Sequence, residues 1–362
     1  DVLNNCITYD LKDSEPYYIN EYKRKTYKEL PLQKQNIIDI LKCHDIASKK
    51  YIYSQYDYTV GNRTLTKPES TSSSGLWIKE ENKFIAFTMD SNPRQCFLNP
   101  YEGSVNTVYE AFRNITASGF KPSGITDCLN FASPEDIGVQ YQFVKSVEGI
   151  SKACIELNIP ILSGNVSFYN ETPDNKIYPT PVIGMMGISE NNIFKNSIKE
   201  NDFVYLIGKD IDEKTYTGGS LYQKLFYNFT GGEIDTVNSE LELKLSTFIL
   251  QMINKNNISG CNDISKGGLF ISLFELLHTA KKGFKGSLIN IKEGQKALFG
   301  EITGRYIITS HRTLEEEMKN NLIPFRFLGK IQSETLEFND FRFNIKELFV
   351  IYEKAFESEL NS

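Results

Sequence analysis

Several features that identify common classes of protein are missing from this sequence of 362 residues. The 40 Lys and Arg are fewer than the 46 Asp and Glu, so the chain lacks the basic excess of nucleic-acid-binding proteins. The sequence contains no run of about 18 apolar residues, the length needed to span a membrane. Segment 1–22 is too polar to contain the apolar region of a signal peptide. We therefore expect neither a nucleic-acid partner nor a membrane partner.

Cysteine and the familiar nucleotide-binding motifs are also scarce or missing. The six cysteines form no Cys-x-x-Cys pair and no zinc-like spacing with the three histidines. Free thiols in a reducing compartment are the simplest interpretation, so we expect a cytoplasmic location. Neither Gly-x-x-x-x-Gly-Lys-Ser/Thr nor a Gly-x-Gly-x-x-Gly that opens a helix after a strand occurs. Any nucleotide site must therefore be built differently.

The patterns that are present predict two α+β domains in series. Residues 1–50 form a leader and a linker helix, 51–197 a first domain and 198–362 a second, with the boundary in a polar stretch. In the first domain, Ser104 is expected to cap one amphipathic helix, and a second helix covers 143–157. Strands are expected at residues 51–56, 84–89, 159–162 and 180–187, and segment 124–131 is expected to be a strand that runs into a loop.

Small polar residues follow two of these predicted strands. Gly164 would let the backbone approach a ligand, Asn165 offers an amide oxygen that Mg²⁺ accepts, and Ser167 offers a hydroxyl. Asp127 follows the preceding strand, and a helical crossover would bring both strand ends to one edge of a sheet. Ordinary turn chemistry at 163–165 and a loop-capping role for Asp127 remain open alternatives.

Two further sets of oxygen-bearing side chains could hold a cation or an anion. Glu110 and Asn114 are four residues apart on one helix face. Asp263 and Ser265 precede a Gly-Gly pair and a helix N-terminus, where the helix dipole favours phosphate. A solvated helix face and an N-cap cluster are the alternatives for these two sets.

A series of motifs then makes a resemblance specific. In chain order they are Tyr56-Asp57-x-x-Val60, Thr88-x-Asp90-x-Asn92-x-Arg94, Glu110-Ala-x-Arg-Asn114, Thr126-Asp-Cys-Leu-Asn-Phe131, Ser163-Gly-Asn-Val-Ser-Phe-Tyr-Asn-Glu171, Tyr178-Pro-Thr-Pro-Val-Ile-Gly184, Gly218-Gly-Ser220, Asp263-Ile-Ser-x-Gly-Gly268 and Gly300-Glu-x-x-Gly-Arg305. From about residue 36 onward the chain resembles the synthetase subunit of phosphoribosylformylglycinamidine (FGAM) synthase, but only its C-terminal half. That subunit repeats a module shared with aminoimidazole ribonucleotide synthetase, and its catalytic histidines belong to the first copy.

The resemblance implies a fold, a reaction and the roles of four residues. The implied fold is α+β: an N-terminal domain that contributes strands to a shared barrel, and a C-terminal α/β sandwich domain. The implied activity is an ATP-dependent carbon–nitrogen ligase of de novo purine biosynthesis, inactive without the N-terminal half. It converts formylglycinamide ribonucleotide (FGAR) to FGAM with glutamine-derived ammonia. Asp127 and Gly164 would contact ATP, Asn165 would bind Mg²⁺ and Ser167 would contact the substrate, with no catalytic residue in this half.

Large members of the family also hold a structural nucleotide at an auxiliary site. Glu110, Asn114 and Asp263 match its metal ligands, and Ser265 matches a nucleotide contact. The chain departs from the family at residues 68–74, where Pro-Glu-Ser-Thr-Ser-Ser-Ser replaces Pro-Gly-x-Asp-Ala-Ala and one carboxylate is lost. The roles of Asp57, Asp90 and Arg94 stay open between the cleft and structural anchoring.

The resemblance also implies partners and leaves two rival functions. Expected partners are the N-terminal half, in the same chain or as a split subunit, a glutaminase subunit and a small accessory subunit. One rival is a stand-alone enzyme like aminoimidazole ribonucleotide synthetase or selenophosphate synthetase. The other is a non-catalytic, nucleotide-binding scaffold.

Overall fold

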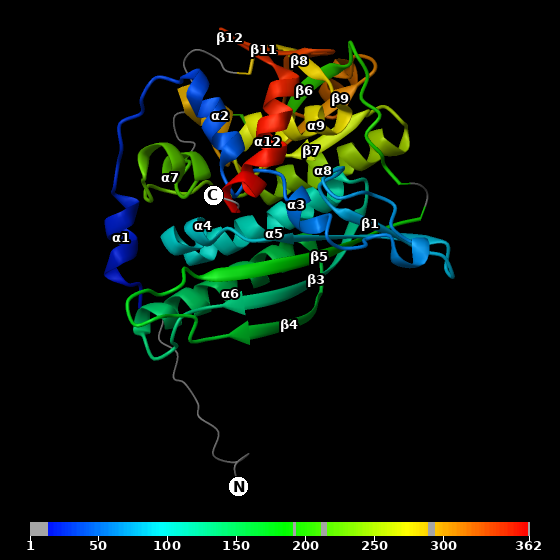
Figure 1. The fold of residues 1–362 in the computed structure, drawn as a ribbon. Helices are drawn as coiled ribbons and strands as arrows, with labels where there is room; N and C mark the ends of the chain where they lie inside the picture. The colour runs from blue at the N-terminus through cyan, green and yellow to red at the C-terminus, as the bar shows by residue number, and fades with distance from the viewer. Residues whose placement is uncertain (1–13, 191–192, 211–215, 289–293, 361–362) are drawn as a thin grey trace.

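The computed structural model describes residues 14–190, 193–210, 216–288 and 294–360. Two mixed β-sheets with helices between and around them confirm the predicted α+β class (Figure 1). The first sheet has five strands in the order β1-β2-β5-β3-β4. Their bounds are β1 Ser74–Ile78, β2 Lys83–Asp90, β3 Lys121–Asn130, β4 Ile161–Ser167 and β5 Thr180–Ser189.

One face of the five-stranded sheet is covered by α5 (Pro100–Ala117) and α6 (Ile137–Leu157). Alternating residues of the strands, such as Ile125 and Ile183, pack with these helices in one core. The opposite face has no such cover in the described residues. There Met89 keeps 78% of its surface exposed and Phe87 keeps 43%, so the sheet is open and does not close into a barrel.

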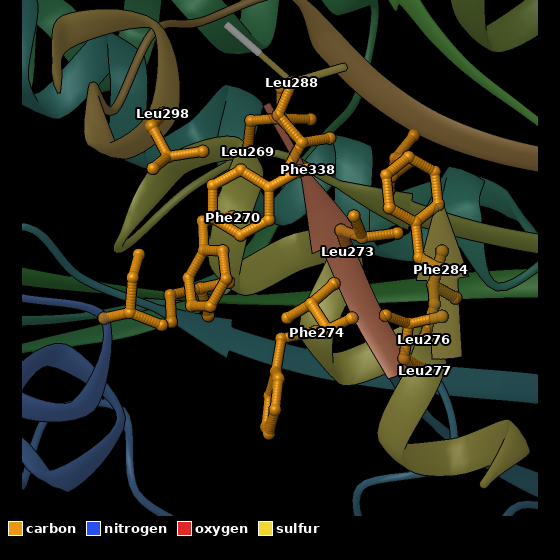
Figure 2. Packing of buried hydrophobic residues seen from close by; sticks show 14 of the residues in the cluster. Leu269, Phe270, Leu273, Phe274, Leu276, Leu277, Phe284, Leu288, Leu298 and Phe338 are labelled. Atoms are coloured by element: carbon orange, nitrogen blue, oxygen red, sulfur yellow. The ribbon is translucent and has the colours of Figure 1, made fainter. Parts of the chain in front are cut away.

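The second sheet has seven strands in the order β12-β11-β8-β10-β6-β9-β7. Helix α9 (Gly268–Ala280) and α12 (Ile345–Leu360) form the core on one face, where the aromatic and leucine side chains of α9 meet Phe284 and Phe338 (Figure 2). Helix α8 (Ser239–Asn254) covers the other face. The strands are β6 Phe203–Gly208, β7 Gly260–Asp263, β8 Gly283–Gly286, β9 Arg305–Ser310, β10 Phe325–Gln332, β11 Thr335–Phe338 and β12 Phe341–Asn344.

Shorter helices complete the fold. They are α1 Tyr17–Lys23, α2 Lys34–Lys42, α3 Lys50–Tyr53, a 3₁₀ turn Val60–Asn62, α4 Pro93–Leu98, α7 Leu221–Tyr227, α10 Gly294–Phe299 and α11 Glu315–Asn320. None of the helices in the described part combines the length and the apolarity needed to cross a bilayer. The five described cysteines are free thiols, and Cys6 lies outside the described residues.

Three details of the sequence prediction are wrong. Residues 51–56 contain the end of α3 and no strand, because the amides of Tyr53 and Ser54 bond to carbonyls four residues back. The helix expected to begin at Ser104 begins at Pro100, where Asn99 caps it by accepting from the Glu102 amide at 3.1 Å. The strand expected to end before residue 163 continues to Ser167, because β4 pairs with β3 over that length.

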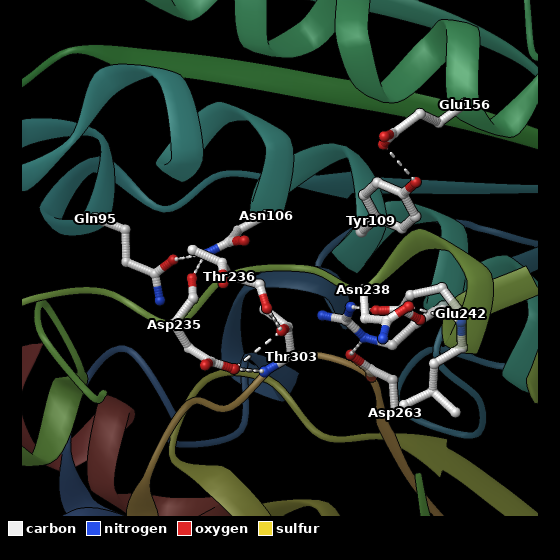
Figure 3. Close-up of polar contacts among 12 residues, drawn as sticks. Gln95, Asn106, Tyr109, Glu156, Asp235, Thr236, Asn238, Glu242, Asp263 and Thr303 are labelled. Carbon is white, nitrogen blue, oxygen red and sulfur yellow. Dashed lines mark hydrogen bonds and ion pairs between the residues drawn. The ribbon is translucent and has the colours of Figure 1, made fainter. Parts of the chain in front are cut away.

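Helix α5 connects the two halves of the molecule. Fifteen of its 18 residues are buried, because the five-stranded sheet lies on one side of it and α8 and β7 on the other (Figure 1). Its Arg113 pairs with Glu242 of α8 at 2.7 Å and lies 4.0 Å from the Asp263 carboxylate at the end of β7. Figure 3 shows the side chains of Glu242 and Asp263 close to each other. All three side chains are almost fully buried. This ion cluster therefore ties α5 to two elements of the second sheet's layer.

Arg113→Met tests this tie, because it removes the cation and leaves two buried carboxylates without it. We expect the free energy of unfolding to fall by about 3–5 kcal/mol, the usual cost of breaking a buried pair, in urea titrations followed by circular dichroism. The control is Arg63→Met, whose partner Glu80 is exposed; it should leave stability unchanged. Equal losses in the two variants would contradict a special role for Arg113.

Candidate functional site

The four residues implied to bind ATP, metal and substrate lie on two neighbouring strands. Strands β3 and β4 run parallel, with Asp127 opposite Gly164, Cys128 opposite Asn165 and Asn130 opposite Ser167. Helix α6 forms the crossover between them, as the sequence predicted. The residues thus lie within paired strands and not in loops beyond the strand ends.

Strand alternation divides these residues between the two faces of the sheet. Asn165 and Ser167 lie on the open face, beside the polar side chains of β3 there, and Asn165 is exposed. Asp127 shares the helix-covered face with Leu129, which is in the core. The structure therefore brings Asn165 and Ser167 together, and Asp127 and Gly164 together, but the two pairs face opposite ways.

Gly164 has a specific steric reason to be glycine. A Cβ placed on it would lie 2.4 Å from Oδ1 of Asp127, so any larger residue would displace the carboxylate. The Asp127 side chain can lean across β4 only because no side chain stands there. Since β4 is the last strand of the sheet, this carboxylate lies beside the free edge. Partial burial raises its pKa above the usual value.

Asn165 fits one position in the coordination of a magnesium ion. Its side-chain amide has no hydrogen-bond partner among the described residues. Mg²⁺ commonly takes one or two protein oxygens together with phosphate oxygens and water. No three His, Cys, Asp or Glu side chains in the described segments converge closely enough to hold a metal by themselves. A metal at Asn165 would therefore depend on its nucleotide for most of its ligands.

The residues matched to the auxiliary site belong to an acidic cluster between the two sheets, in which Asn114 and Asp263 are buried and Glu110 and Asp90 are half-buried. The amide of Asn114 donates to Asp90 at 2.8 Å. Burial, then repulsion from Asp90 and Asp263, raises the pKa of Glu110 to about 8. Burial and the charge of Asp263 raise the pKa of Asp90 to about 7. Glu110, Asn114, Asp90 and Asp263 are therefore close enough to affect one another.

A cavity of about 220 Å³ opens beside this cluster. Asn114, Asp263 and Ser265 line it, whereas Glu110 does not. Two further carboxylates, Glu69 and Glu275, line the same cavity and had not been expected. The local sequence around each residue does not predict that they meet: Glu69 is in the loop that departs from the family pattern, and Glu275 is on α9.

Hydrogen bonds hold the 69–72 loop against this cavity. Glu69 accepts from the Ser48 hydroxyl at 2.7 Å and from the Lys49 amide at 2.8 Å, and its carbonyl accepts from Thr279. Ser72 donates to the side chain of Asn262. Burial and the nearby Asp263 raise the pKa of Glu275 to about 7. Carboxylates of this kind suit a hard cation chemically, although the described side chains do not bring three of them to one point.

The three residues with open roles have different surroundings. Asp57 is exposed and accepts from the Thr59 amide at 2.7 Å, a local turn. Arg94 donates to the Gly219 carbonyl at 3.0 Å and pairs with Asp45 at 3.3 Å, which anchors the Gly218–Ser220 loop. Of the three, Asp90 alone belongs to the acidic cluster.

Glu301 connects several of the recognised motifs, a role that the sequence analysis missed. Its carboxylate accepts from the Leu221 amide at 2.7 Å, the Gly267 amide at 3.3 Å and the Asn92 side chain at 3.4 Å. The side chain is buried. The motif Gly300-Glu-x-x-Gly-Arg305 was the available signal in the sequence, but the three partners of Glu301 are distant in sequence.

Comparison with known proteins agrees with this architecture. Residues 74–189, which span the five-stranded sheet, match the family model "AIR synthase related protein, N-terminal domain". The PurL subunit of phosphoribosylformylglycinamidine synthase from Petrotoga mobilis is 42% identical over 94% of this chain. Residues 74–189 thus match an AIR synthase-related domain, and this chain is similar to PurL subunits over most of its length. It spans about half the length of the curated relatives that it matches, 49% in the Petrotoga protein.

Solved structures of this family show the same fold. Thermotoga maritima PurL complexed with FGAR matches 92% of this chain and 56% of its own length, at a TM-score of 0.68 and 16% identity. The same protein complexed with ATP matches 86% of this chain and 52% of its own, at a TM-score of 0.62 and 16% identity. These matches show that the fold is shared. At 16% identity they do not show that the residues of this chain bind the same ligands.

Glu110→Gln tests the acidic cluster through the pH dependence of stability. Because the pKa of Glu110 is raised to about 8 in the folded chain, the wild type should lose stability as pH rises from about 4.5 toward 8. The variant should therefore unfold at a higher temperature than the wild type at pH 8.5 and at a similar temperature at pH 5.5, in EDTA. The exposed Glu316→Gln is the control, and parallel wild-type and Glu110→Gln curves would refute the assignment.

Proposed function

We propose that this chain is the C-terminal half of an FGAM synthase synthetase subunit, which binds ATP, Mg²⁺ and FGAR. The observation that carries the proposal is the pairing on β3 and β4. Asn165 and Ser167 stand together on an open face, and Asp127 leans across Gly164 at the adjoining free edge. The 42% identity to a PurL subunit and the FGAR- and ATP-bound relatives support the same conclusion.

In this proposal a nucleotide reaches both pairs of residues around the edge of the sheet. Asp127 and Gly164 bind ATP from one side of β4, while Asn165 holds the ion and Ser167 the substrate on the other. A bound Mg²⁺ would neutralise phosphate charge, and enzymes catalyse phosphoryl transfer mostly by such neutralisation and by positioning the reactants. The side chains at 127, 165 and 167 bind and orient; none of them is required to act as an acid or base.

The reaction activates the amide oxygen of FGAR with the terminal phosphoryl group of ATP. Ammonia then adds to the amide carbon, and phosphate leaves with the former amide oxygen. A glutaminase subunit is proposed to supply the ammonia, and a small accessory subunit is proposed as a further partner. A cytoplasmic location belongs to the same proposal.

The N-terminal half is proposed to cover the open face of the five-stranded sheet. Exposed apolar residues there, including Phe87 and Met89, form a surface that a monomer seldom leaves bare. Strand β4 has a free edge, which a partner strand or loop could pair. For this reason we infer that the chain does not turn over substrate by itself.

Reconstitution tests this function. Mixed with the N-terminal half of a PurL subunit, the chain should form FGAM and ADP from FGAR, ATP and ammonium chloride, and neither half should do so alone. Asn165→Ala should lower kcat/KM by about 100-fold or more, as for removal of one charge-stabilising contact. Asn175→Ala, in an exposed loop, is the matched control.

The same experiment separates the rival functions. ATP turnover by the chain alone would favour a stand-alone enzyme of the aminoimidazole ribonucleotide synthetase or selenophosphate synthetase kind. Nucleotide binding without turnover in the reconstituted pair would favour a non-catalytic scaffold. Either result would contradict the proposal.

A further inference from the structure

Asn170 lies in the loop between β4 and β5, three residues beyond the residue proposed to contact the substrate. Its side-chain amide donates to the carbonyl oxygens of Ser167 at 2.8 Å and Phe131 at 3.0 Å. The amide has two hydrogens, which these two carbonyls and the Ser167 hydroxyl oxygen share. The Ser167 hydroxyl oxygen accepts from the same amide nitrogen at 3.2 Å, and the hydroxyl can donate to the amide oxygen at 3.4 Å.

The backbone of Asn170 extends this link to a third segment. Its amide donates to the Phe131 carbonyl at 3.1 Å, and its carbonyl accepts from Ile177 on the returning limb of the loop at 3.1 Å. One residue thus joins the end of β3, the end of β4 and the start of the chain into β5. Both the carbonyl and the hydroxyl of Ser167 are held by this junction.

The loop on either side of Asn170 is also fixed. Tyr169 adopts a left-handed φ of 61°, which reverses the chain directly after β4. Phe168 packs edge-on against Phe143 of α6, with ring centroids 5.2 Å apart. Tyr178, at the far end of the loop, stacks on Phe97 at 4.5 Å. The position of Asn170 is therefore set from both sides.

From these contacts we infer that Asn170 is a positioning residue for substrate binding, which acts by orienting the Ser167 hydroxyl. A serine hydroxyl that no neighbour holds rotates freely, and a ligand must then fix it at an entropic cost. The Asn170 amide fixes it beforehand. The inference rests on the proposed function, because it is defined by the role of Ser167 toward FGAR.

A double-mutant cycle in the reconstituted synthetase tests the inference, with ammonium chloride as the nitrogen source. Asn170→Ala should raise the KM for FGAR by about 10-fold, the effect of about one hydrogen bond. The kcat and the KM for ATP should stay within about 2-fold, which a general loss of folding would not allow. In a Ser167→Ala background, Asn170→Ala should add no further increase, because residues that act through one contact are not additive.

Two variants complete the design. Asn170→Asp keeps an acceptor for the Ser167 hydroxyl but loses the donors to both carbonyls and to the hydroxyl oxygen. Its KM for FGAR should therefore lie between those of the wild type and Asn170→Ala. Asn175→Ala, in the same loop, should match the wild type. An unchanged KM for FGAR in Asn170→Ala, or multiplicative effects in the double variant, would overturn the inference alone. An inactive wild-type assembly would overturn the proposed function and this inference with it.

Discussion

The buried guanidinium of Arg113 is the constraint on which the arrangement of the molecule depends. A buried cation is tolerable only beside its counter-ions, and these come from α8 and the end of β7. Helix α5 must therefore stay against the second sheet's layer while its other side packs on the five-stranded sheet. With α5 and α6 fixed on one face of that sheet, the opposite face has no cover within the described chain.

The open face combines two surfaces of different character. Strands β1, β2 and β5 contribute apolar side chains to it, whereas β3 and β4 contribute hydroxyl, thiol and amide groups. An apolar surface of this kind favours contact with another protein surface, and the adjoining polar surface offers ligand contacts at a free edge. The proposed role as half of a composite site follows from this combination.

Sequence reasoning identified the order of the elements better than their ends. The helix expected at 143–157 and the strands expected at 84–89 and 180–187 are present, because their periodicity reflects burial on one face. The end of strand β4 was placed too early because Ser, Gly and Asn at 163–165 are typical of the ends of strands, although pairing with β3 overrides that preference. That error concealed the opposite orientations of Asp127 and Asn165. Glu69, Glu275 and Glu301 could not be identified, because their partners come from distant parts of the chain. The roles of the predicted site residues stay predictions.

Hydrogen–deuterium exchange of β4 tests the central claim, that the open face and free edge of the five-stranded sheet form a surface for a second protein half. In the isolated chain the β4 amides that point away from β3 should exchange rapidly, and α5 amides slowly. Addition of the N-terminal half should slow exchange in β4 and leave α5 unchanged. Exchange in β4 that is already slow in the isolated chain, or that the N-terminal half does not alter, would contradict the account.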